Sequence, residues 1–444
     1  SIPSAILSLR LLPFGLLSIA ARAQDDELGA ASKFFAGPVE TIATHDEFVW
    51  LESPVWNDAG QYLLFTDVKW SNDDGWHCGM IWKYDESTSR LSKFLPCSGL
   101  FGPGDIPEDI DEWYEAGGNG MYWGWKGASS GDLLIAQHGK ARIARINVND
   151  VDEESGTIDP SLVSVVVDGY NGTKLNAPND MTIYNGDLYF TDPPFGLQKK
   201  NSIVDDPWGQ AFEEAVQDPA VYRIHGGDPG TSKAEDGKVE RVVGIPRTPD
   251  LLHAFNGIAL NDAGEMFVAI TDWEDPHFRV YGHSSGNMAD SAPVRVESEY
   301  RIVNNTDNLP TLNDGLTYSP GLNAIFATGP GGVYVYNATT YDLLGFVRLD
   351  DLVANNVIGG GCLWMTVNRR LMRIPLSEEA AAATAGEGQM EGEGGDEQEE
   401  SPEGDGEDAM GEEDPSSASS SVAVAFGCIQ SLVVVTAGAL VGFV

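Results

Sequence analysis

The sequence has 444 residues, a formal net charge of −42 and 42% hydrophobic residues. A chain of this length can bury a large core. Its acidic balance excludes the basic face that nucleic acid binding needs, so we expect no nucleic acid partner. Neutral molecules and cations are the better candidates.

The N-terminal segment 1–24 has an apolar run followed by small residues, which is the pattern of a secretory signal peptide. An amphipathic N-terminal segment is the alternative. Three Asn-x-Thr sequons, at Asn171, Asn304 and Asn337, agree with a secretory route. We therefore expect the protein outside the cell or on its surface, as a glycoprotein.

Between residues 46 and 376, one pattern recurs six times: a polar residue, an apolar strand, a Gly/Asn/Asp turn and a second apolar strand. The first instance reads ESPVWNDAGQYLLFTD and the last NNVIGGGCLWMTV. Small antiparallel sheets repeated in this way are typical of a β-propeller, in which each blade buries its faces on its neighbours. We predict an all-β fold with a six-bladed β-propeller over residues 25–376. The stretch GPVETIATHDEFVW could add a strand to the last blade and close the ring.

Two cysteines flank a predicted hairpin in the first unit. Cys78 and Cys97 enclose GMIWKYDESTSRLSKFLP, which folds about Ser87 and Thr88 and sets the two cysteines opposite each other. We predict a Cys78–Cys97 disulfide, with two buried thiols as the alternative. Cys362 is expected in the core. The cysteines show no CxxC or Cys/His spacing, which argues against a cysteine-bound zinc site.

A second hairpin is predicted over residues 181–192. MTIY and DLYF are joined by Asn-Gly, a pair that supplies the two positive φ angles of a type I′ turn.

The chain after the repeats is acidic and then apolar. Sixteen acidic residues and no Lys or Arg lie between Glu378 and Asp414, so we expect residues 377–421 to be a disordered linker. Residues 422–444 are apolar with no basic residue after them, which favours a GPI-attachment signal. A transmembrane anchor is the alternative, and either would attach the protein to a membrane.

The polar residues that begin the six units all carry side-chain oxygens. They are Glu52, Asn119, Asn179, Asn256, Asp314 and Asn355 or Asn356. In a propeller these residues converge at one rim of the central channel. Strand caps alone would mix in Ser, Thr, Gly and Lys. Two carboxylates with amide oxygens suit Ca²⁺, with Mg²⁺, Mn²⁺ or Zn²⁺ as alternatives.

These motifs resemble the gluconolactonase branch of the SMP-30/gluconolactonase/LRE-like family. The matching stretches occur in the family's order and cover about three quarters of the chain: ESPVW, LLIAQHGKARIARI, LNAPNDMTIYNGDLYFTDPPFGL, NGIAL, NDGLTY and ATGPGGVYVY. The resemblance implies a six-bladed propeller with one divalent metal held by Glu52, Asn179, Asn256 and Asp314. The family commonly has Pro before the last two ligands, and this chain does not; Asn313 precedes Asp314.

The resemblance also implies lactone hydrolysis, in which the metal polarises the ester carbonyl. Asp314 is the family's usual general base, but a carboxylate bound to a cation is a weak base. Asp180 and His138 are therefore further candidates. Asn119 and His138 are candidate substrate contacts, and a hydrogen-bonded strand-end histidine is the alternative for His138.

Other functions remain open. A non-catalytic surface module stabilised by calcium would keep the same ligands. A strictosidine-synthase-like propeller shares the architecture but generally lacks the metal set. The metal site could also hydrolyse organophosphates.

Overall fold

The computed structural model describes residues 33–125, 131–200, 211, 215–226, 239–245, 254–272, 276–282, 293–297, 312–349 and 351–387. The signal-like segment 1–24, Asn304 and the apolar segment 422–444 with Cys428 lie outside these residues. The secretion and anchor predictions therefore stay predictions. In the described ranges, no helix is long and apolar enough to cross a membrane.

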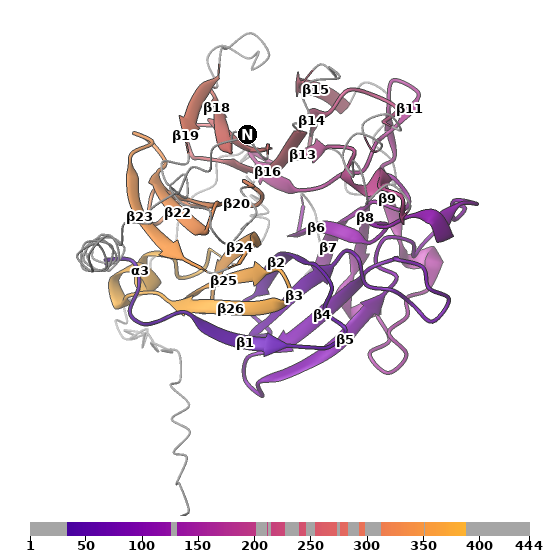
Figure 1. Ribbon diagram of the computed structural model, residues 1–444, viewed down its shortest axis with the longest axis horizontal. Helices are drawn as coiled ribbons and strands as arrows, with labels where there is room; N and C mark the ends of the chain where they lie inside the picture. The colour runs from indigo at the N-terminus through magenta and orange to yellow at the C-terminus, as the bar shows by residue number, and fades with distance from the viewer. Residues whose placement is uncertain are drawn as a thin grey trace, which may run out of the picture. The chain divides into compact units, whose positions relative to one another are not determined.

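Six four-stranded antiparallel sheets surround a common axis, as Figure 1 shows. Blades one and two contain β2 (Leu51–Asn57), β3 (Tyr62–Asp67), β4 (Met80–Asp85) and β5 (Arg90–Pro96), then β6 (Gly118–Trp123), β7 (Asp132–Gln137), β8 (Arg142–Asn147) and β9 (Ser164–Val167). Blades three and four contain β12 (Met181–Tyr184), β13 (Asp187–Asp192), β14 (Ala220–Ile224) and β15 (Val239–Gly244), then β16 (Ala254–Leu260), β17 (Met266–Thr271), β18 (His277–Tyr281) and β19 (Val294–Glu297). Blades five and six contain β20 (Leu316–Ser319), β21 (Ala324–Gly329), β22 (Gly332–Asn337) and β23 (Leu343–Arg348), then β24 (Val353–Gly359), β25 (Cys362–Val367) and β26 (Arg370–Pro375). The fold is the predicted six-bladed β-propeller.

The sixth blade is completed by the N-terminal strand β1 (Glu40–Thr44), which pairs antiparallel with β26. The two strands lie side by side in the lower part of Figure 1. Arg373 Nε lies 3.1 Å from Glu40 Oε2 and adds an ion pair to the ladder. The prediction that the segment before the first unit closes the ring is confirmed. The two ends of the propeller chain thus hold each other in one sheet.

The Asn-Gly hairpin forms as predicted. β12 and β13 pair from Met181 with Phe190 to Tyr184 with Asp187. Asn185 has φ 50° and Gly186 has φ 78°, so both turn residues adopt the left-handed backbone of a type I′ turn. A smaller ribbon, β10 (Gly169–Tyr170) with β11 (Thr173–Lys174), precedes it.

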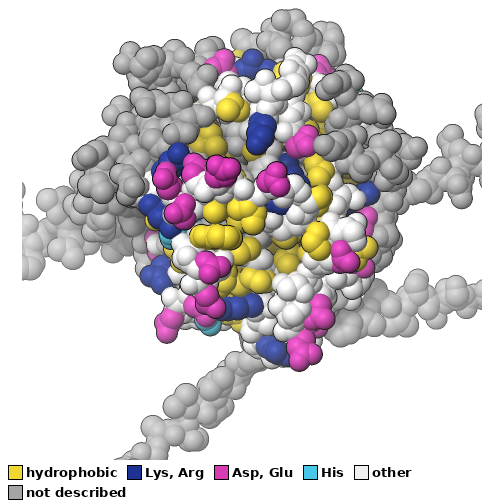
Figure 2. Space-filling view, turned by 90° about the vertical axis from the view of Figure 1, so that its right-hand side faces the viewer, with side chains coloured by type: hydrophobic (Ala, Val, Ile, Leu, Met, Phe, Trp, Pro, Cys, Tyr) yellow, Lys and Arg dark blue, Asp and Glu magenta, His cyan; other side chains and the backbone are white. Residues whose placement is uncertain are grey.

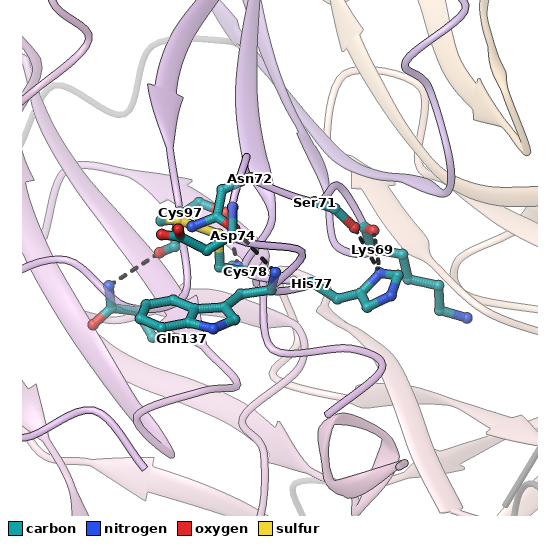
Figure 3. Close-up of a disulfide and its surroundings, with 11 residues drawn as sticks. Lys69, Ser71, Asn72, Asp74, His77, Cys78, Cys97 and Gln137 are labelled. Carbon is teal, nitrogen blue, oxygen red and sulfur yellow. Dashed lines mark hydrogen bonds between the residues drawn. A yellow bond between two sulfur atoms is a disulfide. The ribbon is translucent and has the colours of Figure 1, made fainter. Parts of the chain in front are cut away.

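The first blade carries a disulfide between Cys78 and Cys97, whose Cα atoms are 4.4 Å apart (Figure 3). The hairpin turns over residues 86–89, but a register shift between Ile81 and Trp82 makes Met80 with Pro96 the last ladder pair. The cysteines therefore lie beyond the strand ends rather than in a paired position, which corrects that part of the prediction. Cys362 is buried in blade six.

The same close-up shows part of the loop between β3 and β4, which contains Cys78 near its end (Figure 3). His77 Nδ1 lies 2.9 Å from the carbonyl oxygen of Lys69, and Asn72 Oδ1 accepts the Trp76 N–H at 2.9 Å. These bonds fix the loop that carries Lys69 toward the channel.

The segment after the last blade is structured further than predicted. α3 (Glu378–Ala383) begins at Ser377, whose side-chain oxygen accepts the Ala380 N–H. Ala380 is buried in a cluster with Phe34 and Leu376. Residues 377–387 were expected to be disordered, and this is wrong because alanines in the acidic stretch provide an apolar helical face.

Short 3₁₀ turns interrupt the loops at Ile110–Glu112, Val148–Asp150, Pro160–Leu162 and Phe195–Leu197. On the face shown in Figure 2, Lys and Arg side chains lie singly among Asp, Glu and apolar side chains.

Candidate metal and substrate site

The innermost strands are irregular at the residues proposed to face the channel. In four blades the register shifts there: between Glu52 and Val55, Gly118 and Met121, Phe255 and Ile258, and Val353 and Asn355. Asn119 and Asn256 lie inside the skipped stretches. A β-bulge bends its strand and redirects side chains. This local geometry distinguishes the rim residues from ordinary strand residues.

Glycines let neighbouring inner strands approach closely at this rim. Gly120 donates its N–H to the carbonyl of Asn179 at 2.7 Å, and Gly257 donates to the carbonyl of Asp314 at 3.0 Å. A Cβ at these two positions would lie 2.1 Å and 2.3 Å from the same oxygens. The Asn-Gly pairs at 119–120 and 256–257 thus combine a rim oxygen with a backbone bond to the next blade.

Threonine hydroxyls form a second set of bonds between blades. Each belongs to a Thr-Asp pair at or next to the end of a blade's second strand. The hydroxyls of Thr66, Thr191 and Thr271 donate to the carbonyls of Asn119 (3.1 Å), Asn256 (2.7 Å) and Asn313 (3.0 Å), respectively. These contacts hold the backbone of the rim residues.

The predicted rim residues and the candidate base Asp180 are all buried. Glu52, Asn119, Asn179, Asp180, Asn256, Asp314, Asn355 and Asn356 are each 3–7% exposed. Asn355 Nδ2 donates to Asp180 Oδ2 at 3.5 Å, which joins blade six to blade three across the channel. Asn256 Nδ2 donates to Thr271 Oγ1 at 2.8 Å, so its Oδ1 is the atom left for a cation.

Two carboxylates at the rim repel each other. The pKa of Glu52 is raised to about 8, mainly by burial and also by the negative charges of Glu115 and Asp180. The hydrogen bond from Trp50 Nε1 lowers this pKa but does not offset the burial. Burial, then the charge of Glu52, holds the pKa of Asp314 well above its usual range. A divalent cation would relieve this repulsion, so the donor set fits a metal.

The proposed ligand set contains two carboxylates and the amide oxygens of Asn179 and Asn256. Hard cations accept both kinds of oxygen ligand. Among the residues that the structure describes, no three His, Cys, Asp or Glu side chains form a group that could hold a metal. The amides would therefore have to supply half of the protein ligands.

Asp180 is placed beside this set. Its Oδ1 accepts the Met181 N–H at 3.0 Å, and burial, stronger than its hydrogen bonds, raises its pKa to about 7. A carboxylate with that pKa can exchange a proton near neutral pH.

His138 is fully buried after β7. Its Nδ1 lies 3.3 Å from the carbonyl oxygen of Glu115 and 3.6 Å from Glu115 Oε1. Burial lowers its pKa, so the ring is neutral at pH 7. Its Nε2 has no hydrogen-bond partner among the described residues. The structure thus shows a hydrogen-bonded, fully buried strand-end histidine.

Sequence reasoning did not find Glu115 and Lys69. Lys69 Nζ lies 3.2 Å from Glu115 Oε2 and over the Trp50 ring, 4.5 Å from its centroid. Trp50 in turn donates to Glu52 Oε1 at 3.1 Å. This network connects His138 to Glu52. Both missed residues lie in loops outside the repeated pattern, so no local signal marked them.

The chain is similar in sequence to a known gluconolactonase. No family model matches the chain. It is 28% identical over 319 residues to a gluconolactonase of Zymomonas mobilis subsp. mobilis, covering 70% of this chain and 72% of that protein.

Two solved structures share the architecture. A gluconolactonase from Xanthomonas campestris superposes with a TM-score of 0.52 at 19% identity, covering 79% of this chain and 93% of that one. A presumed gluconolactonase gives 0.51 at 22% identity, covering 78% and 95%. The chain therefore has the six-bladed propeller fold of these structures and is similar in sequence to a gluconolactonase, in agreement with its resemblance to the SMP-30/gluconolactonase/LRE-like family.

Proposed function

We propose that this protein is a divalent-metal-dependent hydrolase that opens a sugar lactone or a related lactone, with Ca²⁺ as the metal. The observation that carries the proposal is the buried pair Glu52 and Asp314 at the channel rim, which repel each other; the amides of Asn179 and Asn256 are buried as well. Similarity to a gluconolactonase supports lactonase activity in general.

Glu52, Asn179, Asn256 and Asp314 would hold the cation. When bound, it supplies a Lewis acid that stabilises the negative charge of an ester carbonyl oxygen under attack. Four protein ligands leave room on a cation that takes six to eight.

The proton of the attacking water needs an acceptor, and Asp180 is the stronger candidate. Asp180 is not one of the four proposed ligands and its burial raises its pKa, whereas Asp314 would lose basicity as a ligand. We assign to Asn119 and His138 the orientation of the substrate, through the amide of the first and Nε2 of the second. His138 is the second candidate base because that nitrogen has no hydrogen-bond partner among the described residues.

Calorimetric calcium titrations of the wild type, Asp314→Asn and Asn256→Ala test the ligand set. The charge-removing variant should lose more affinity than the variant that removes one neutral oxygen, because the cation is held mainly by its two negative charges. Raising the calcium concentration should partly restore Asn256→Ala. If both variants fold and bind calcium as tightly as the wild type, the proposed ligand set is wrong.

Lactone assays on Asp180→Asn and His138→Gln identify the base. Loss of kcat in the first with calcium affinity kept would assign the base to Asp180, and the reverse pattern would assign it to His138. A panel of aldonolactones, aliphatic lactones and an organophosphate defines the substrate class. Calcium binding with no turnover on the whole panel would establish a non-catalytic module instead.

A further inference from the structure

A cavity of about 730 Å³ occupies the channel, and neither Glu52 nor Asp314 lines it. It runs from Asp180 and Asn355, at the level of the candidate site, along all six inner strands to the turns at their far ends. Its far mouth is lined by Ala383, at the end of α3, and by Ala385, Gly386 and Glu387. A cavity of this size holds a drug-sized molecule.

The far mouth is acidic and aromatic. Asp262 and Glu387 lie there with Tyr184 and Tyr318. Tyr184 donates its hydroxyl to the Asp262 carbonyl at 3.4 Å, and the negative charge of Asp262 acts on both Glu387 and Tyr318. No Lys, Arg or His is among the described residues that line the cavity.

Glu387 has a fixed position at this mouth. Its Oε1 accepts the Gly321 N–H at 2.7 Å and the Ser319 hydroxyl at 3.0 Å. One carboxylate oxygen is thus occupied by the blade-five turn.

Deeper in the channel, Asn356 provides a buried acceptor. It is 3% exposed, its Nδ2 donates to the Phe326 carbonyl at 3.2 Å, and its backbone carbonyl accepts the Thr317 hydroxyl at 2.7 Å. Its Oδ1 has no hydrogen-bond partner among the described residues. An unpaired buried oxygen is costly, and a ligand that donates a hydrogen bond would remove that cost.

We propose that this channel is a second binding site, which meets the metal site at Asp180 and Asn355, for a small organic ammonium ion with an apolar or aromatic body. The ammonium would be attracted by Asp262 and Glu387 and could contact the tyrosine rings, and a donor of the ligand would reach Asn356 Oδ1. This inference does not depend on lactone hydrolysis.

The following part of this chain is a poor occupant of the channel. Residues 388–414 carry thirteen Asp and Glu and no Lys or Arg. The acidic lining would repel such a segment.

The experiment uses the full chain and three probes of similar shape, each with a phenol hydroxyl as the second donor: tyramine, the neutral alcohol 4-(2-hydroxyethyl)phenol and the anionic 4-hydroxyphenylacetate. Binding is measured by calorimetry and by ligand-observed NMR. The amine should bind, the alcohol should bind about tenfold more weakly, and the acid should not bind. Equal binding of amine and alcohol, or no amine binding, would overturn the proposal.

Variants locate the site. Asp262→Asn with Glu387→Gln should weaken amine binding about tenfold and leave calcium affinity at the rim unchanged. Glu379→Gln, on the exposed side of α3, is the matched control and should change nothing. Unchanged amine binding in the double variant would place the amine elsewhere.

Two further outcomes would also overturn the proposal. Displacement of the amine by CaCl₂ in Asp314→Asn would show a metal site at the mouth. Amine binding that appears only after removal of residues 388–444 would assign the channel to this chain's own segment.

Discussion

Single residues show how burial and backbone bonds compete at the ends of the second strands. Asp67 Oδ2 and Oδ1 accept the N–H groups of Val49 and Trp50, both at 2.9 Å. Asp192 accepts those of Asn176 and Ala177 in the same way, also at 2.9 Å. The hydrogen bonds lower the pKa of each carboxyl, but the effect of burial is larger. Burial raises the pKa of Asp67 to about 6 and that of Asp192 to about 7.

These shifts predict how stability depends on pH. The folded-state pKa of Asp192 lies above its unfolded value of about 3.9, so the folded protein binds the extra proton between about pH 4 and 7. The contribution of this group to stability is full below pH 4 and is lost as pH rises toward 7.

Chemical unfolding of the wild type and Asp192→Asn across pH 4 to 8 measures this contribution. The variant should show a flatter decline with rising pH, by an amount on the order of a few kcal/mol. Parallel curves for the two proteins would show that Asp192 does not carry the shift.

The site residues differ in how far sequence could identify them. Periodicity could place Glu52, Asn179, Asn256 and Asp314 at one rim because each opens a repeated unit, and the family resemblance selected these four as metal ligands. Lys69 and Glu115 could not, because their contact joins two irregular loops and depends on the tertiary fold.

Among the elements, β13 of blade three supports the site most directly. The hydroxyl of Thr191 donates to the carbonyl of Asn256 at 2.7 Å and accepts the N–H of Asp180 at 3.2 Å. One side chain therefore positions residues of two blades.

Thr191→Val should weaken calcium binding and raise KM for the lactone, and it should destabilise the fold by about 1–3 kcal/mol because two buried polar groups lose their partner. Thr191→Ser keeps the hydroxyl and should restore calcium affinity. Thr340→Val, at an exposed turn, is the control. If Val and Ser variants bind calcium alike, the hydroxyl has no positioning role.

The hairpin β4–β5 carries the disulfide prediction. Cys78–Cys97 closes a loop of sequence separation 19, for which chain entropy gives about 3 kcal/mol. The double variant Cys78→Ala/Cys97→Ala should unfold at lower denaturant, while kcat should change little because neither sulfur reaches the rim. A large loss of kcat with stability unchanged would contradict this assignment.

Elements were predictable where the signal was local. The Asn-Gly turn sets its own backbone angles, so the 181–192 hairpin followed from two residues. The positions of the two cysteines relative to the β4–β5 ladder could not be predicted from sequence, because the register shift near Trp82 depends on packing. α3 was not predicted because the acidic composition of its segment indicated disorder, although Ala380 packs in an apolar cluster.

At the scale of the whole molecule, the six units and the closing strand were predictable because every blade repeats one pattern and the ring needs a partner for β26. The end of the domain was not. Residues 377–387 pack against the first described residues and the channel mouth.

Two truncations test this boundary. A chain ending at Glu387 should keep its stability and its calcium affinity, because the rim residues all precede the cut. A chain ending at Ser377 should lose about 1–3 kcal/mol, because Phe34 and Leu376 lose the apolar cover of α3. Thermal unfolding distinguishes them, and equal midpoints would return the boundary to residue 376.

The central claim is that the rim residues hold a metal on which lactone opening depends. Its most direct test is lactone turnover by the full chain after EDTA treatment and again after CaCl₂ is restored, with Asp314→Asn in parallel. We predict that EDTA abolishes wild-type turnover, that CaCl₂ restores it, and that Asp314→Asn stays nearly inactive at the same calcium concentration. Full turnover in EDTA, or wild-type turnover in Asp314→Asn, would contradict the claim.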